Sequence, residues 1–88
     1  MENRIKDNSR CGVIGYGTWA TALVHTLQRN GKDIWWHIRN EEVLESITVE
    51  GRNAKYLSDV EFNKEKITAT SDINEVVSNC EVILVAAP

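Results

Sequence analysis

The sequence predicts an α/β fold in which a parallel β-sheet carries helices on both faces. Four strand-like runs alternate with three segments of helical periodicity, and this alternation favours parallel strands joined by right-handed crossovers. A glycine-rich turn follows the first run directly, at residues 15–20. The chain has 88 residues, which is enough for one small domain at most.

The first part of the chain supplies a strand and a helix. Residues 1–9 are polar and have no period, so we predict a flexible tail there. Residues 11–15 form an apolar run that ends in glycine, which is typical of a buried strand. From Ala20 onwards, apolar residues recur at i, i+3, i+4 and i+7, and this spacing predicts a helix. Asn30 and Gly31 supply its end.

A second strand and helix follow. Residues 34–38 are rich in aromatic and β-branched side chains, which favours a strand. Asn40 is a good N-cap for a helix whose first residues, Glu41 and Glu42, suit the positive end of the helix dipole. Residues 51–64 are polar and poorly patterned, so they predict a long loop.

The third helix is marked by its cap. Residues 66–70 predict a third strand, and Asp72 can then cap a helix, with Glu75 completing a pair like that of a capping box. Val76 and Val77 are expected to face inward.

The last run, residues 82–88, predicts an interior strand buried on both faces. Because chain termini tend to lie at the surface of a domain, we expect a fold truncated after the fourth strand. A catalytic substrate domain is then expected to be absent from this chain.

Composition excludes several classes of protein. Hydrophobic residues make up 42% and charged residues 26%, which is ordinary for a globular domain. Ten Lys and Arg against thirteen Asp and Glu give a net charge of −3, which does not favour a nucleic-acid-binding surface. The longest apolar run is far shorter than the roughly 20 residues that span a bilayer, so no membrane span is predicted.

Cysteine and histidine usage points to a cytoplasmic protein without a metal. The two cysteines, Cys11 and Cys80, make no disulfide framework and fit a reducing compartment, and the start of the chain lacks a secretory signal. No cluster of His, Cys and Asp has metal-ligand spacing. We expect His25 to be a solvated surface side chain and His37 to be packed or at a strand edge.

The turn after the first strand carries the clearest chemical signal. Residues 15–20 read Gly-Tyr-Gly-Thr-Trp-Ala, which fits the pattern G-x-G-x-x-G/A. Gly15 allows the tight turn, Gly17 lets the backbone approach a pyrophosphate, and Ala20 lets the helix pack closely on the sheet. The free N–H groups of the helix then favour the anion. Residues 10–88 therefore predict a partial Rossmann-like dinucleotide-binding domain, the alternative being a glycine turn without a ligand.

The end of the second strand bears on the choice of cofactor. Sites for NAD usually carry Asp or Glu there to hold the ribose hydroxyls, whereas this chain has Arg39 followed by Asn40. Arg39 could pair with the 2′-phosphate of NADP or stack on adenine, or it could be a solvated charge. We expect NADP or NAD as the cofactor, with a preference for NADP.

Several segments resemble a known family. Residues 15–23 are similar to the Gly-x-Gly-Ser-Trp-Gly-Thr-Ala-Leu signature of bacterial-type glycerol-3-phosphate dehydrogenases, and residues 53–57 to its Asn-x-x-Tyr-Leu segment. Residues 67–72 resemble its third strand and helix cap, and residues 82–88 its strand ending in Ala-Val-Pro. The resemblance covers about residues 11–88, with Ala20 in place of a glycine.

The resemblance implies further site residues. It assigns cofactor contacts to Thr18 and Trp19, the basic pair of the second strand to Arg39 and Asn40, and a loop tyrosine to Tyr56. It also implies that Pro88 borders the nicotinamide side. The predicted cofactor-binding residues are thus Gly15, Gly17, Thr18, Trp19, Ala20, Arg39, Asn40, Tyr56 and Pro88.

The family reduces dihydroxyacetone phosphate to sn-glycerol 3-phosphate by hydride transfer, and catalyses the reverse reaction, in the supply of phospholipid precursors. Its catalytic lysines lie beyond the matched segment, so no catalytic residue is predicted here, and a homodimer would form through the missing domain. Two alternatives stay open. One is another reductase of the 6-phosphogluconate or ketopantoate type, and the other is a non-enzymatic dinucleotide-sensing domain.

Overall fold

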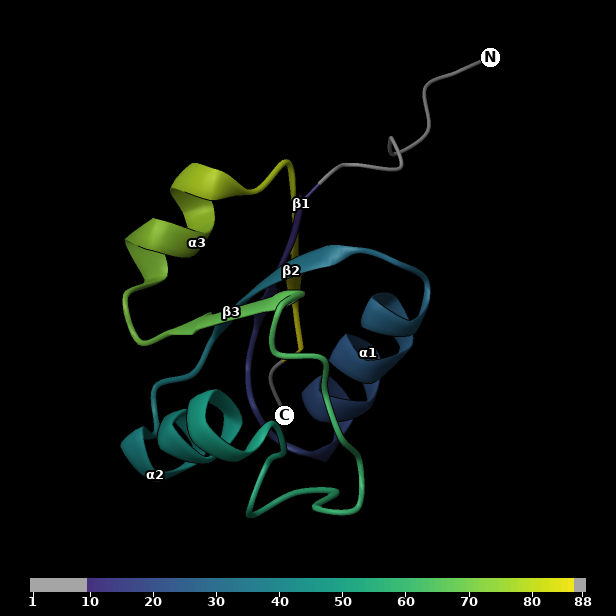
Figure 1. Ribbon diagram of the computed structural model, residues 1–88. Helices are drawn as coiled ribbons and strands as arrows, with labels where there is room; N and C mark the ends of the chain where they lie inside the picture. The colour runs from purple at the N-terminus through teal and green to yellow at the C-terminus, as the bar shows by residue number, and fades with distance from the viewer. Residues whose placement is uncertain (1–9, 87–88) are drawn as a thin grey trace.

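A four-stranded parallel sheet forms the centre of the computed structural model, which describes residues 10–86 (Figure 1). The strand order is β3-β2-β1-β4. The chain therefore moves from β1 outward through β2 to β3, and then crosses back to place β4 on the other side of β1. The elements in chain order are β1 (Arg10–Ile14), α1 (Thr18–Arg29), β2 (Asp33–His37), α2 (Glu41–Glu45), a π-helical turn (Ser46–Glu50), β3 (Ile67–Thr70), α3 (Ile73–Asn79) and β4 (Val82–Val85). The predicted α/β fold is therefore confirmed, while the predicted tail at residues 1–9 and Pro88 lie outside the described residues.

Helices cover both faces of the sheet. Val13 packs in one core with Ala20 and Val24 of α1 and with Val43 of α2. The neighbouring residue Gly12 faces the other way, since side chains alternate along a strand. A Cβ atom at that glycine would lie 2.7 Å from Val76 Cγ1, so α3 packs directly on the backbone of β1.

Two helix starts follow their local signals. The Asn40 side chain accepts a hydrogen bond from Val43 N at 3.0 Å, and the Asp72 side chain accepts one from Asn74 N at 2.9 Å. The capping box at α3 is indirect, however. Thr70 Oγ1 accepts from Asp72 N at 3.0 Å and donates to Glu75 Oε1 at 2.7 Å, so a hydroxyl stands between the two expected partners.

The α3 face differs from the expectation in two ways. Val76 is fully buried, but Val77 is 56% exposed, because neighbouring helix positions point about 100° apart. The prediction that Val77 faces inward was wrong. Among the described residues β4 pairs only with β1, so it is a half-buried edge strand rather than one buried on both faces.

Cys11 and Cys80 are free thiols in this structure. Burial raises the pKa of the Cys80 thiol, and the neighbouring Cys11 adds to the effect. The neutral thiol of Cys80 lies over Gly12, where a Cβ would meet its Sγ at 3.1 Å. It therefore acts as a packing group beneath α3.

The long loop between the π-helical turn and β3 is anchored by Phe62. Its ring packs edge-on against Trp36, with centroids 5.4 Å apart, and against His25 at 6.0 Å. His25 is thus half-buried on Phe62, and the prediction of a solvated side chain was wrong. A single aromatic residue connects this loop to both the sheet and α1.

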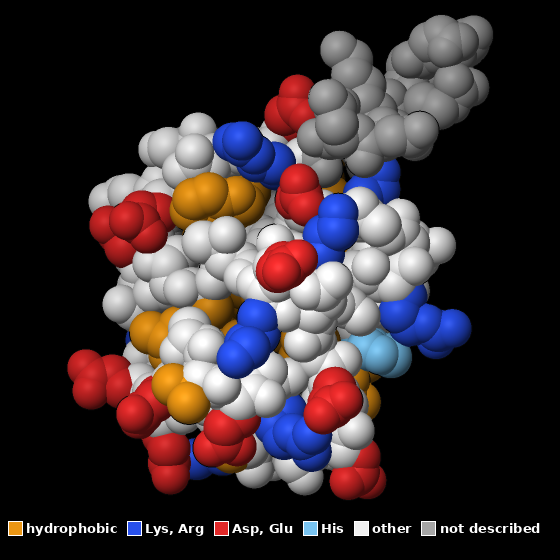
Figure 2. All heavy atoms as spheres, viewed as in Figure 1, with side chains coloured by type: hydrophobic (Ala, Val, Ile, Leu, Met, Phe, Trp, Pro, Cys, Tyr) orange, Lys and Arg blue, Asp and Glu red, His pale blue; other side chains and the backbone are white. Residues whose placement is uncertain are grey.

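Charged side chains of both signs are intermixed on the face seen in Figure 2. No helix within residues 10–86 is long and apolar enough to cross a membrane.

Replacing Phe62 by Ala should lower the free energy of unfolding by about 3–4 kcal/mol, because a buried aromatic ring leaves a cavity between α1 and the sheet. Urea denaturation of the gene product that contains this chain measures the change. Val49→Ala serves as the control, because Val49 is 62% exposed, and it should change stability by less than about 0.5 kcal/mol. Equal effects of the two substitutions would contradict the anchoring role.

Candidate functional site

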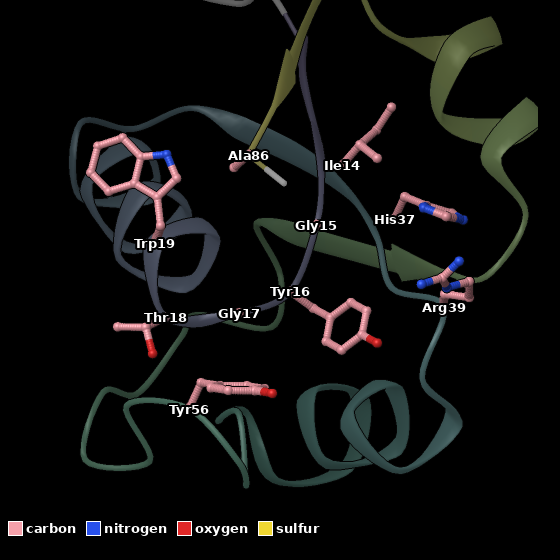
Figure 3. A pocket seen from close by; sticks show the side chains of 10 residues that line it. All are labelled: Ile14, Gly15, Tyr16, Gly17, Thr18, Trp19, His37, Arg39, Tyr56 and Ala86. Carbon is pink, nitrogen blue, oxygen red and sulfur yellow. The ribbon is translucent and has the colours of Figure 1, made fainter. Parts of the chain in front are cut away.

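A cleft of about 580 Å³ opens where β1, β2 and β4 end (Figure 3). It lies at the point where the strand order reverses between β1 and β4, which is where open parallel sheets bind ligands. The residues that line it are Ile14, Gly15, Tyr16, Gly17, Thr18, Trp19, His37, Arg39, Tyr56 and Ala86.

Gly15 is required by the fold itself. Its φ of +124° is strained for any other residue, and an added Cβ would lie only 2.6 Å from the Ala86 carbonyl oxygen. The core also holds this turn, because the indole Nε1 of the buried Trp36 donates to the Gly15 carbonyl at 2.6 Å. The turn is therefore fixed by the core before any ligand enters.

Gly17 has a different environment. Its φ is −77°, and a Cβ atom added there would meet no described atom within 4 Å. No packing in the described chain calls for glycine at this position. The open space in front of Gly17 is where an anion would approach the start of α1.

The start of α1 suits an anion. Gly17 is the N-cap residue and provides no side-chain cap, and the first turn contains no acidic residue. The first N–H groups of a helix have no partner within the helix, and the helix dipole is positive there. Residues 15–18 therefore fit the pyrophosphate of a dinucleotide by shape, charge and hydrogen-bonding capacity.

Asn53 ties this turn to the long loop. Its side chain is fully buried, and Nδ2 donates to the Tyr16 carbonyl at 3.0 Å and to Thr21 Oγ1 at 2.9 Å. Its Oδ1 accepts from the backbone N–H groups of Lys55 and Tyr56, each at 3.0 Å. One carboxamide thus sets the turn at residues 15–18, which we call the phosphate turn, relative to α1 and to the loop.

Two tyrosines stand at the mouth of the cleft. The rings of Tyr16 and Tyr56 meet edge to face, with centroids 6.5 Å apart and planes at 61° (Figure 3). Tyr56 is among the predicted site residues, whereas Tyr16 is not. The two rings form an aromatic wall next to the phosphate turn.

The predicted site residues of α1 and Arg39 lie on different sides of the cleft. Thr18 and Trp19 are in the first turn of α1, and the Trp19 indole is 68% exposed on the side of Ala86. Arg39 lies beyond the end of β2, on the opposite side of the view in Figure 3. The turn at Gly17 lies between them.

Two of the predicted residues that the structure describes are not in the cleft wall. Ala20 is fully buried beneath the turn, where its small side chain permits close packing of α1. The Asn40 side chain caps α2. Pro88 lies outside the described residues. Conversely, Ile14, Tyr16, His37 and Ala86 line the cleft without having been predicted, and alternation back from Arg39 is the sequence signal that would have found His37.

Comparison with known proteins agrees with this geometry. Residues 10–88 match the family described as the NAD-dependent glycerol-3-phosphate dehydrogenase N-terminus. The chain belongs to this family. The resemblance drawn from residues 15–23 and 53–57 is thereby confirmed.

Relatives in the family are much longer than this chain. A protein of Halothermothrix orenii named glycerol-3-phosphate dehydrogenase (NAD(P)+) is 37% identical over 81 residues, which are 92% of this chain and 24% of that protein. One of the same name from Staphylococcus carnosus is 32% identical, with coverage of 91% and 24%. The crystal structure of glycerol-3-phosphate dehydrogenase from Coxiella burnetii superposes with a TM-score of 0.85 at 25% identity, covering 94% of this chain and 25% of that one. The chain thus spans about a quarter of the length of these relatives.

Asn53→Ala should lower the free energy of unfolding by about 2–3 kcal/mol, because it removes the four hydrogen bonds by which a fully buried side chain joins the turn, α1 and the loop. Asn63→Ala is the matched control in the same loop, since Asn63 is exposed, and it should cost less than about 1 kcal/mol. Chemical denaturation of both variants measures the difference. A loss at Asn53 no larger than at Asn63 would contradict the linking role.

Proposed function

We propose that this chain is the cofactor-binding part of an oxidoreductase that transfers hydride between NAD(P)H and dihydroxyacetone phosphate or sn-glycerol 3-phosphate. The observation that carries the proposal is the open space at Gly17, before an uncapped helix start, in a chain of this family. The glycine serves no packing purpose there, so a ligand is the reason for its small size. The names of the relatives supply the substrate class.

Different residues of the chain would hold different parts of the cofactor. The turn from Gly15 to Thr18 would hold the pyrophosphate with backbone N–H groups, and Arg39 would contact the adenosine end. Trp19 and Tyr56 would border the rest of the cofactor. The cofactor supplies the hydride, and this chain would bind and orient it, so the proposal assigns no catalytic residue to residues 10–86.

We place the reaction in the cytoplasm and expect two copies to associate through a domain that is not part of this chain.

Turnover of dihydroxyacetone phosphate tests the reaction. The gene product that contains this chain should oxidise NADH or NADPH when this substrate is added, which absorbance of the reduced cofactor follows. Turnover of a different ketone or ketoacid alone would favour the reductases of the 6-phosphogluconate or ketopantoate type. Dinucleotide binding without turnover of any of them would favour a sensing domain.

Gly17→Val should abolish dinucleotide binding while leaving stability within about 1–2 kcal/mol, because the side chain enters the ligand space and only weakens a helix cap. Gly31→Val is the matched control at the other end of α1. Its φ of +82° makes the substitution destabilising by about 1–3 kcal/mol, and binding should not change. Calorimetric titration with NADPH and thermal unfolding give the two readouts. Undiminished affinity in Gly17→Val would remove the basis of the proposal.

Arg39→Ala should weaken NADPH roughly tenfold or more and NADH by a much smaller factor, because a guanidinium pairs with a 2′-phosphate. Lys55→Ala is a suitable control, since Lys55 is exposed and contacts Glu42 instead of the cleft. Dissociation constants for both cofactors measure the effect. An equal loss for NADH and NADPH would show that Arg39 does not select the cofactor.

A further inference from the structure

His37 occupies a position in the cleft that the proposed function does not use. It is the last residue of β2, half-buried, and lines the cleft together with Arg39 two residues later (Figure 3). None of the described residues that line the cleft carries a carboxylate. The ribose hydroxyls of a dinucleotide would therefore find no acidic acceptor at this strand end, where such sites usually provide one.

The imidazole is oriented by the backbone. His37 Nε2 lies 3.2 Å from the Ser71 carbonyl oxygen, and since a carbonyl only accepts, Nε2 donates the hydrogen bond. The proton on Nε2 assigns the tautomer of the neutral ring, in which Nδ1 is an acceptor. Nδ1 has no hydrogen-bond partner among residues 10–86. It is the ring atom available to a ligand.

The charged groups on the elements next to His37 either make hydrogen bonds of their own or line the cleft. On the β3–α3 side, the Asp72 carboxylate accepts from Asn74 N and the Glu75 carboxylate accepts from Thr70 Oγ1. On the cleft side, the titratable groups are the Arg39 guanidinium and the phenols of Tyr16 and Tyr56. Arg39 is thus the fixed positive charge beside His37, and the imidazole adds a second charge only when it is protonated.

We propose that His37, through Nδ1, selects between the two cofactors according to its protonation state. The neutral ring accepts a hydrogen bond from the ribose 2′-hydroxyl of NAD. The imidazolium ring donates to the 2′-phosphate of NADP, alongside Arg39. This inference rests on the proposed function, because it needs a dinucleotide in the cleft.

The expected direction with pH follows from these two forms. Lowering the pH protonates Nδ1, which removes the acceptor for the hydroxyl and adds a cation for the phosphate. Selectivity for the phosphorylated ribose therefore rises as the pH falls. A phosphate monoester itself gains a proton near pH 6, which works against this trend, so a variant without the imidazole has to set the baseline.

The test uses two fragments that differ only in the 2′-phosphate, namely 2′,5′-ADP and 5′-AMP. Calorimetric titrations at about pH 6 and about pH 8 give a selectivity, defined as the dissociation constant of 5′-AMP divided by that of 2′,5′-ADP. His37→Gln is the reference variant. The glutamine amide can still donate to the Ser71 carbonyl, while the substitution removes Nδ1. His25→Gln controls for a histidine outside the cleft.

The wild-type selectivity should exceed that of His37→Gln roughly fivefold at about pH 6, and at about pH 8 it should be no higher than that of His37→Gln. Titrations in buffers of different ionisation enthalpy should show extra proton uptake with 2′,5′-ADP that His37→Gln lacks. If NADH and NADPH bind but the selectivity is unaffected by His37, this inference is overturned and the proposed function stands. If neither dinucleotide binds, both are overturned.

Discussion

The buried carboxamide of Asn53 is the contact on which the shape of the cleft depends. It joins the phosphate turn, the first helix and the long loop through four hydrogen bonds, two donated and two accepted. The hydrogen bonds offset the hydration that the buried amide loses, whereas a partial set would leave buried polar atoms without partners. The three segments therefore take up this arrangement together, and Tyr56 is brought to the mouth of the cleft as a consequence.

The two glycines of the turn have different surroundings. Gly15 is confined by Ala86, Ala20 and its own positive φ, so the protein interior accounts for it completely. Gly17 has open space in front of it and an ordinary φ, so packing within the described residues does not call for a glycine there. The same pattern of sequence letters thus contains one position that the fold requires and one that stays accessible. Under the proposed function, the pyrophosphate approaches the accessible position.

Local signals predicted the elements well, and contacts between distant segments explain the rest. The capping residues Asn40 and Asp72 act within three positions of their partners, which a sequence displays directly. His25 was mispredicted because its burial depends on Phe62, which lies 37 positions away in a loop without a period. His37 is a different case, because alternation back from Arg39 places it on the cleft side of β2. What the sequence does not display is its hydrogen bond to the Ser71 carbonyl, 34 positions away. Contacts between positions so far apart leave no local pattern in the sequence.

The cleft is chemically uneven from one end to the other, and this unevenness limits what can occupy it. Arg39 and His37 place basic groups at the end of β2, helix N–H groups lie at the centre, and the exposed indole of Trp19 lies on the far side. An elongated ligand with a phosphorylated or hydroxylated sugar at one end, a pyrophosphate in the middle and a flat ring at the other matches all three parts. A shorter anion would use the centre alone and leave both the basic and the aromatic ends without a purpose. The distribution of side chains therefore favours a complete dinucleotide over a simple phosphate ester.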